Sequence, residues 1–162
     1  MGKCGDADLA VILAVMLVFP VCNLLSGFPV FGAELLYVSL AAVAEECFFR
    51  GFLFTALQKR GKLMAALITS GLFALLHLVN LANYPLDYTL LQVVSAFSVG
   101  IALCGLMDRT QKLWPCLVCH LLINLTGHAY LTALGVGLTL FCVVFYAGVG
   151  LFLLRKKNEV QL

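Results

Sequence analysis

The amino-acid sequence predicts an all-α membrane protein, a polytopic bundle of about six transmembrane helices forming one domain over residues 1–162. Of the 162 residues, 63% are hydrophobic and only 11% are charged, whereas an average soluble domain has about 25% charged residues. A transmembrane helix needs roughly 20 apolar residues, so six helices would use about 120 residues and leave about 40 for the connections.

Apolar runs separated by turn signals define these helices in chain order. The predicted helices cover approximately residues 9–25, 31–57, 63–81, 89–107, 113–127 and 131–154. The intervening segments are rich in Gly, Pro, Asn and basic residues, which interrupt helices. We expect the first run to be a retained helix rather than a signal peptide, because Asp6 and Asp8 precede it. Pro115 falls in the first turn of the fifth helix, where its missing N–H is tolerated.

The positions of the basic residues support six crossings. Nine of the ten lie before the first helix or after the second, fourth and sixth, namely Lys3, Lys59, Arg60, Lys62, Arg109, Lys112, Arg155, Lys156 and Lys157. Six crossings place all nine on one side of the membrane, and cytoplasmic loops are enriched in Lys and Arg. We therefore expect both termini to be cytoplasmic, in a bacterial cell membrane. No basic run is long enough to predict a nucleic-acid partner.

Three ionisable residues interrupt the second apolar run, in the stretch Ala44-Glu45-Glu46-Cys47-Phe48-Phe49-Arg50-Gly51. Each costs on the order of 2.5–3.5 kcal/mol at the centre of a membrane helix, so such residues indicate a functional site. Glu46 and Arg50 have the i,i+4 spacing of an ion pair, with the acid first. Glu45 lies about 140° away from Arg50 around a regular helix. This arrangement leaves Glu45 to face a cavity as a general base.

Polar residues of two later helices are predicted to share the depth of Glu45. At 1.5 Å per residue, Glu45 lies roughly 21 Å before the basic turn at residues 58–62, and His77 lies about 22 Å after it. Counted from Lys112, His120 is about 12 Å deep and Asn124 about 18 Å deep. The sequence therefore predicts that Glu45, His77, His120 and Asn124 converge within the membrane as the catalytic residues.

These residue types suit peptide-bond hydrolysis. His77 could orient a water molecule against Glu45, and His120 with Asn124 presents two donors for an oxyanion. Other readings stay open: Glu46 with Arg50 as a structural ion pair, and the histidines as polar contacts between helices. Two histidines and one carboxylate could also bind Zn²⁺, but an HExxH spacing is absent. We therefore predict no metal and no cofactor.

The motifs Glu45-Glu46-x-x-x-Arg50, Phe73-x-x-x-His77 and His120-x-x-x-Asn124 resemble the three motifs of the CAAX protease and bacteriocin-processing (CPBP, or Abi) family of intramembrane proteases. The resemblance covers about residues 41–127. It implies an intramembrane endopeptidase in which Glu45 activates water together with His77. It also implies that His120 and Asn124 stabilise the oxyanion while Glu46 and Arg50 support the site.

The predicted function is therefore hydrolysis of a peptide bond in a small membrane-associated or prenylated-type peptide, with membrane lipid as the other partner. One alternative is a non-enzymatic bacteriocin immunity or scaffold protein on the same fold. A second alternative is a small transporter that uses Glu45 and Glu46 as a proton or cation relay. Against the transporter, the helices lack the paired Gly/Pro interruptions typical of inverted-repeat carriers.

Overall fold

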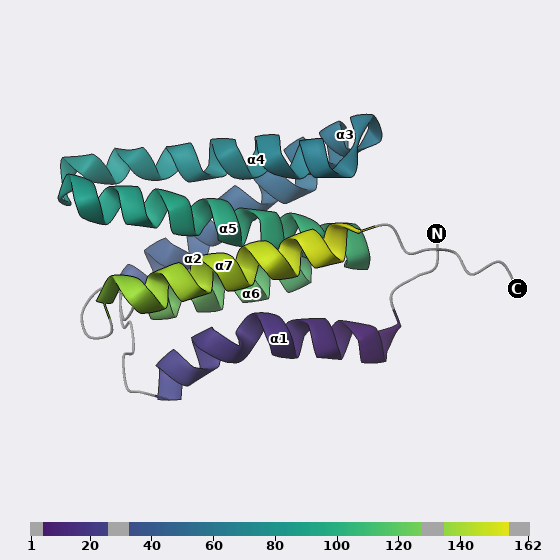
Figure 1. Cartoon of the computed structure of the whole chain (residues 1–162), viewed down its shortest axis with the longest axis horizontal. Coiled ribbons are helices and arrows are strands. Elements are labelled where there is room, and N and C mark those ends of the chain that lie inside the picture. Colours follow the sequence, from purple (N-terminus) through teal and green to yellow (C-terminus); the bar gives the residue numbers. More distant parts are fainter. Residues whose placement is uncertain (1–4, 26–32, 128–134, 156–162) are drawn as a thin grey trace, which may run out of the picture.

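The computed structural model describes residues 5–25, 33–127 and 135–155, and all structural statements refer to these residues. Every regular element in these ranges is helical, and the helices form a bundle (Figure 1). This confirms the predicted all-α membrane fold. Apolar side chains cover much of the outer surface, as expected of helices that face lipid.

Six continuous helical segments correspond to the six predicted helices. The first two are α1 (Asp6–Leu25) and α2 (Ala33–Glu46), and α2 continues through η1 (Cys47–Phe54), α3 (Thr55–Leu57) and η2 (Gln58–Arg60). The third is α4 (Lys62–Leu76) with η3 (His77–Ala82), followed by α5 (Leu86–Thr110), α6 (Trp114–Gly127) and α7 (Gly135–Leu154). The observed α5 is longer at both ends than its predicted range of 89–107.

Three of these segments are long and apolar enough to cross a membrane, namely Lys62–Ala82, Leu86–Thr110 and Val136–Leu154. Two shorter apolar stretches, Ala7–Val18 and Trp114–Leu125, lie in α1 and α6. The segment from Ala33 to Arg60 contains the charged site residues, which lower its hydropathy. The total of six crossings stays a prediction.

The centre of the bundle is α5, which packs between α4 and α7 (Figure 1). Small residues allow the α5–α7 approach, because a Cβ atom on Gly150 would lie 2.6 Å from the backbone N of Ala102. A Cβ atom on Gly105 would lie 2.8 Å from the carbonyl oxygen of Gly150. Gly100 makes a similar approach to Ser70 of α4. Such glycine contacts are a common means of packing helices in membranes.

Charged side chains connect the helices at the end of the bundle that contains η2. Lys62 Nζ lies 2.8 Å from the carboxylate of Asp108, which joins α4 to α5. The guanidinium of Arg109 donates to the carbonyl oxygens of Leu153 and Arg155, at 2.5 and 2.9 Å. A cation at this position satisfies carbonyl groups that the end of α7 would leave unpaired. We refer to this end, with Lys62, Asp108 and Arg109, as the basic end.

The segment after Glu46 is a π-helix rather than the regular α-helix assumed in the sequence analysis. η1 covers eight residues, Cys47–Phe54. It directs the side chains of Phe49, Arg50 and Phe54 into the bundle, whereas Phe52 is exposed. The hydroxyl of Thr55 donates to the carbonyl oxygen of Arg50 at 2.9 Å. Short π-helical segments occur frequently at functional sites.

Candidate active site

The two adjacent glutamates at the end of α2 have different surroundings. Glu46 is fully buried, whereas the side chain of Glu45 keeps 29% of its exposure. Glu45 lines a cavity in the bundle, and Glu46 lies behind it among charged and aromatic groups. One helical turn therefore supplies a carboxylate that a ligand can reach and another that it cannot.

Glu46 joins two residues from different parts of the chain. Its Oε1 atom accepts a hydrogen bond from Arg50 Nη1 at 2.7 Å, so the ion pair expected from the i,i+4 spacing is present. The same oxygen lies 2.7 Å from Nδ1 of His120 on α6. The sequence analysis did not predict this second contact. Because Arg50 and Glu46 are both buried, each needs the other as a counter-ion.

The ring of Phe73 contacts three residues around this cluster, Arg50, His77 and His120. The guanidinium carbon of Arg50 lies 4.4 Å from the centroid of the Phe73 ring, which is a cation–π contact. Edge-to-face contacts join the same ring to His77 and His120, with centroid distances of 5.1 and 5.5 Å. Phe73 belongs to the second sequence motif, and it lines the cavity together with both histidines. It therefore fixes the positions of both histidines.

The hydrogen bond of His120 to Glu46 determines which nitrogen faces Glu45. A carboxylate paired with Arg50 accepts hydrogen bonds, so Nδ1 of His120 carries a hydrogen. The other nitrogen, Nε2, lies 3.5 Å from Oε2 of Glu45. When the ring carries both protons, Nε2 can donate a hydrogen bond to a group beside Glu45. Such ring orientation by a buried carboxylate is a common way of fixing a histidine.

His77 begins η3 and is oriented by its own helix. Its Nδ1 lies 3.1 Å from the carbonyl oxygen of Phe73, and because a carbonyl only accepts, Nδ1 is the donor. In a neutral ring Nε2 is then left as an acceptor. Asn124 lies one turn after His120 on α6, and both face the cavity together with Glu45 and His77.

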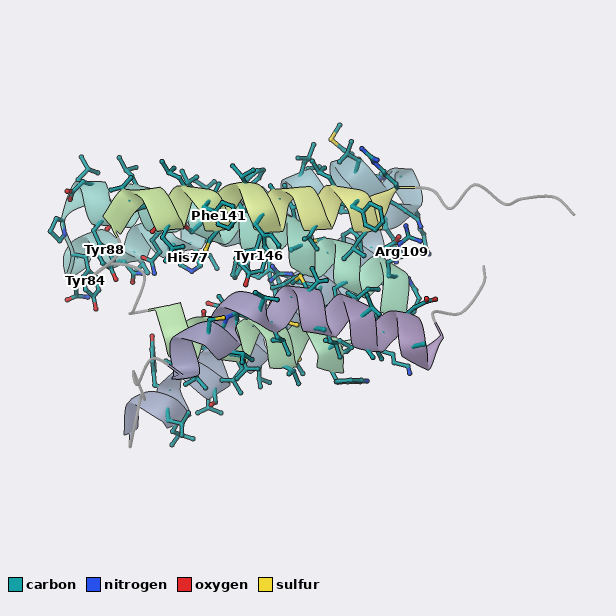
Figure 2. All side chains as sticks on the ribbon, turned by 60° about the horizontal axis from the view of Figure 1, so that its bottom comes forward. His77, Tyr84, Tyr88, Arg109, Phe141 and Tyr146 are labelled. Carbon is teal, nitrogen blue, oxygen red and sulfur yellow. The ribbon has the colours of Figure 1, made fainter. Side chains whose placement is uncertain are left out.

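The four predicted catalytic residues therefore line a single cavity of about 330 Å³. α2, η3 and α6 each contribute at least one of them. The cavity extends along α5 toward Tyr88, away from the basic end. Figure 2 shows Tyr84 and Tyr88 at one end of the bundle and Arg109 at the other, with His77 between them and nearer to the tyrosines.

Metal binding was considered for the same residues. Within the described ranges, no three His, Cys, Asp or Glu side chains are grouped so that they could hold a metal ion. The set considered for Zn²⁺ was Glu45, His77 and His120, and in both histidines Nδ1 has an oxygen partner, which leaves Nε2 for another ligand. The absence of a metal stays a prediction.

Two helices without predicted site residues also line the cavity. α5 contributes Gln92 and Ser95, and α7 contributes Thr139. Gln92 and Ser95 were detectable as polar residues within an apolar run, but their spacing matches no recognised motif. Thr139 gave no signal, because a single Thr in an apolar helix is ordinary.

Comparison with known proteins identifies the family. A family model described as type II CAAX prenyl endopeptidase Rce1-like matches residues 27–126, which is more than half of the chain. The matched region contains all three motifs, from Glu45 to Asn124. Searches of curated proteins and of solved structures found no match. The chain therefore belongs to the Rce1-like family of type II CAAX prenyl endopeptidases, a family of proteases, and is an integral membrane protein.

Proposed function

We propose that this protein is an intramembrane endopeptidase that hydrolyses a peptide bond with a water molecule activated by Glu45. The observation that carries the proposal is the shared cavity, in which Glu45, His77, His120 and Asn124 meet inside an apolar helical bundle. A carboxylate, two imidazoles and an amide are the groups that such a reaction requires.

The reaction begins with water held between Glu45 and His77. The carboxylate of Glu45 takes one proton from the water as its oxygen attacks the carbonyl carbon of the peptide bond. Nε2 of His77 accepts a hydrogen bond from the second water hydrogen and orients the molecule. When the tetrahedral intermediate collapses, the C–N bond breaks and Glu45 gives its proton to the departing amine. The products are a new carboxyl terminus and a new amino terminus.

The negative oxygen of the intermediate accepts hydrogen bonds from His120 Nε2 and from the side-chain amide of Asn124. Because Nδ1 of His120 already donates to Glu46, this role requires His120 to carry both protons. The charges of Glu45, Glu46, Arg50 and doubly protonated His120 then sum to zero. Glu46 and Arg50 act as positioning residues, since they hold the ring of His120 without reaching the substrate.

The proposed substrate is a peptide or small membrane protein presented within the bilayer, including peptides of the prenylated type. The proposed location is a bacterial cell membrane, with several crossings and both termini in the cytoplasm. The distribution of Lys and Arg supports this orientation. The mechanism uses no metal and no cofactor.

The proposal is tested by mapping new protein C-termini in membranes from cells that produce the wild-type protein, Glu45→Gln or Asp87→Asn. Glu45→Gln keeps the shape of the side chain and removes the base. Asp87→Asn is the matched control, because Asp87 is exposed and does not line the cavity. We expect the wild type and Asp87→Asn to produce the same C-termini, and Glu45→Gln to produce at least about 100-fold less of them.

Equal C-termini in the presence of folded Glu45→Gln protein would contradict the hydrolytic role. That outcome would favour the non-enzymatic immunity or scaffold function. The folded amount of each variant is measured by size-exclusion chromatography of the detergent-solubilised protein, so that loss of expression is not mistaken for loss of chemistry.

A further inference from the structure

The cavity contains a second group of polar side chains that the hydrolytic step does not use. Asn80 of η3, Gln92 and Ser95 of α5, and Thr139 of α7 line the cavity together with the catalytic residues and Tyr88. They come from three segments and face the same space as Glu45. Two of them, Ser95 and Thr139, differ in their hydrogen bonding from other hydroxyl residues of α5.

The hydroxyl groups of Ser95 and Thr139 are shielded from solvent and have no hydrogen-bond partner among the residues that the structure describes. Thr139 is 6% exposed. By contrast, Ser98 on the same helix as Ser95 donates to the carbonyl oxygen of Val94 at 3.1 Å. Thr89, also on α5, donates to a backbone carbonyl four residues earlier. Buried polar groups in native proteins rarely lack a partner, so these two cavity hydroxyls indicate that a ligand supplies one.

Asn80 and Gln92 add a paired donor and acceptor. Asn80 Nδ2 donates to Gln92 Oε1 at 2.8 Å, which joins η3 to α5. This bond leaves the Nε2 donors of Gln92 and the Oδ1 acceptor of Asn80 for a ligand. A donor beside an acceptor complements a peptide group, which offers one C=O and one N–H.

Gln92 and Ser95 are close enough along α5 for one short extended segment to contact both. Gln92 and Ser95 are separated by about 4.5 Å along α5, and an extended chain advances about 3.3 Å per residue. Most other residues along this part of the cavity, such as Ala41, Ala96 and Val99, offer only apolar side chains. A peptide backbone within the membrane needs internal partners for its N–H and C=O groups, and these four side chains can provide them.

We propose that Asn80, Gln92, Ser95 and Thr139 form a substrate-binding subsite that hydrogen-bonds the main chain of an extended peptide segment. The inference rests on the proposed function, because it assumes that the ligand is the peptide to be cleaved. The subsite recognises backbone rather than particular side chains, and it aligns the segment beside Glu45. The cavity volume of about 330 Å³ holds a short unfolded segment, since it is at the lower end of ligand pockets of about 300–1,000 Å³.

The test measures peptide binding to full-length protein in detergent micelles, with Glu45→Gln as the parent so that bound peptides are not hydrolysed. The probe is a random decapeptide library, and retained peptides are quantified by mass spectrometry. Ser95→Ala and Thr139→Val are added together to remove both hydroxyls with little change in shape. Ser98→Ala added to the same parent is the matched control, because Ser98 lies on α5 but does not line the cavity.

We expect retention to fall about tenfold when both hydroxyls are removed, since each lost hydrogen bond typically weakens binding severalfold. The Ser98→Ala control should retain peptides like the parent. In the best-retained peptide, each amide is then replaced by an ester, which removes one N–H. One or two replacements should weaken binding to the parent, and at least one of them should have no effect once Ser95 and Thr139 are changed.

Absence of any retained peptide, equal retention with and without the two hydroxyls, or identical ester effects in both proteins would overturn the subsite. Equal unfolding temperatures of the variants exclude misfolding as the cause of weaker binding. If peptides are retained as expected while wild-type membranes produce no new C-termini, the proposed hydrolysis fails, and the four side chains form a peptide-binding site whose ligand is not cleaved. The binding experiment therefore separates the two proposals.

Discussion

The two ends of the helical bundle are built differently. At the basic end, the Lys62–Asp108 ion pair and the hydrogen bonds of Arg109 join α4, α5 and α7, and glycines at positions 105 and 150 bring α5 and α7 together. The opposite half contains the cavity, in which some hydroxyl groups lack partners. The difference shows how a small membrane protein can keep a hollow site. Close packing at one end fixes the helices, so the other half does not need to fill its interior.

Glu45 and Glu46, which are adjacent in sequence, lie in different regions: Glu45 lines the cavity, and Glu46 is packed in the bundle beside it. Glu46 belongs to the closed side, where Arg50 and His120 use its carboxylate oxygen. Glu45 faces the cavity. Two adjacent glutamates thus have different surroundings, and the proposed mechanism gives Glu46 a structural role and Glu45 a chemical one. Three experiments test this difference: labelling of the two ends of the bundle, stability of variants at the two glutamates, and stability of variants at the α5–α7 contact.

The largest effect is expected in the accessibility of the two ends. Arg60→Cys marks the basic end, and Asn83→Cys marks the turn that joins η3 to α5, where both native side chains are exposed. If basic residues are cytoplasmic, an impermeant maleimide added to intact cells should label Asn83→Cys and leave Arg60→Cys unlabelled until the cells are opened. The wild-type protein gives the background from native cysteines. The reverse pattern would place the cavity half on the cytoplasmic side.

A smaller but distinct effect is expected on stability at the two glutamates. Glu46→Gln leaves Arg50 buried without its counter-ion, which should lower the free energy of unfolding by about 3–5 kcal/mol. Glu45→Gln should change it by less than about 1 kcal/mol, because Glu45 is partly exposed and lies 3.5 Å from His120, whereas Glu46 is fully buried and contacts both Arg50 and His120. Denaturant unfolding in detergent micelles measures both. Equal stability of the two variants would contradict the structural role of Glu46.

The smallest effect concerns the α5–α7 contact. A Cβ atom on Gly150 would lie 2.6 Å from backbone atoms of α5, whereas one on Gly148 would meet nothing within 4 Å. Gly150→Ala should therefore destabilise the bundle by about 1–3 kcal/mol through overpacking. Gly148→Ala, in the same helix, should be neutral or slightly stabilising. Thermal unfolding of the two purified variants compares them, and a neutral Gly150→Ala would show that the contact does not hold the basic end together.

Much of this organisation could be predicted from the sequence. Apolar runs and turn residues located six helical segments, and helix rise alone brought Glu45 and His77 to one level. The Glu46–Arg50 pair followed from i,i+4 spacing, which survives although the segment from Cys47 is π-helical. Helix positions and i,i+4 pairs depend on residues that are close in the sequence, so local sequence patterns predict them.

Contacts between helices that are distant in the sequence could not be predicted from the sequence. The bond from Glu46 to His120 joins residues 74 positions apart, and nothing in either motif specifies it. Phe73 belongs to the second motif, but the sequence does not show that Arg50 lies over its ring. Ser95 and Thr139 became candidates only when the packing of α5 and α7 brought their hydroxyls into the cavity. Such pairings depend on how helices rotate against one another.

The central claim is that water attacks a peptide bond in this cavity with Glu45 as the base. It is tested most directly by incubating membranes that contain wild-type or Glu45→Gln protein in water enriched in oxygen-18. Mass spectrometry then identifies protein C-termini whose carboxylate contains the heavy oxygen. The account predicts labelled C-termini with the wild type and their absence with Glu45→Gln. Equal labelling with the two proteins would contradict it.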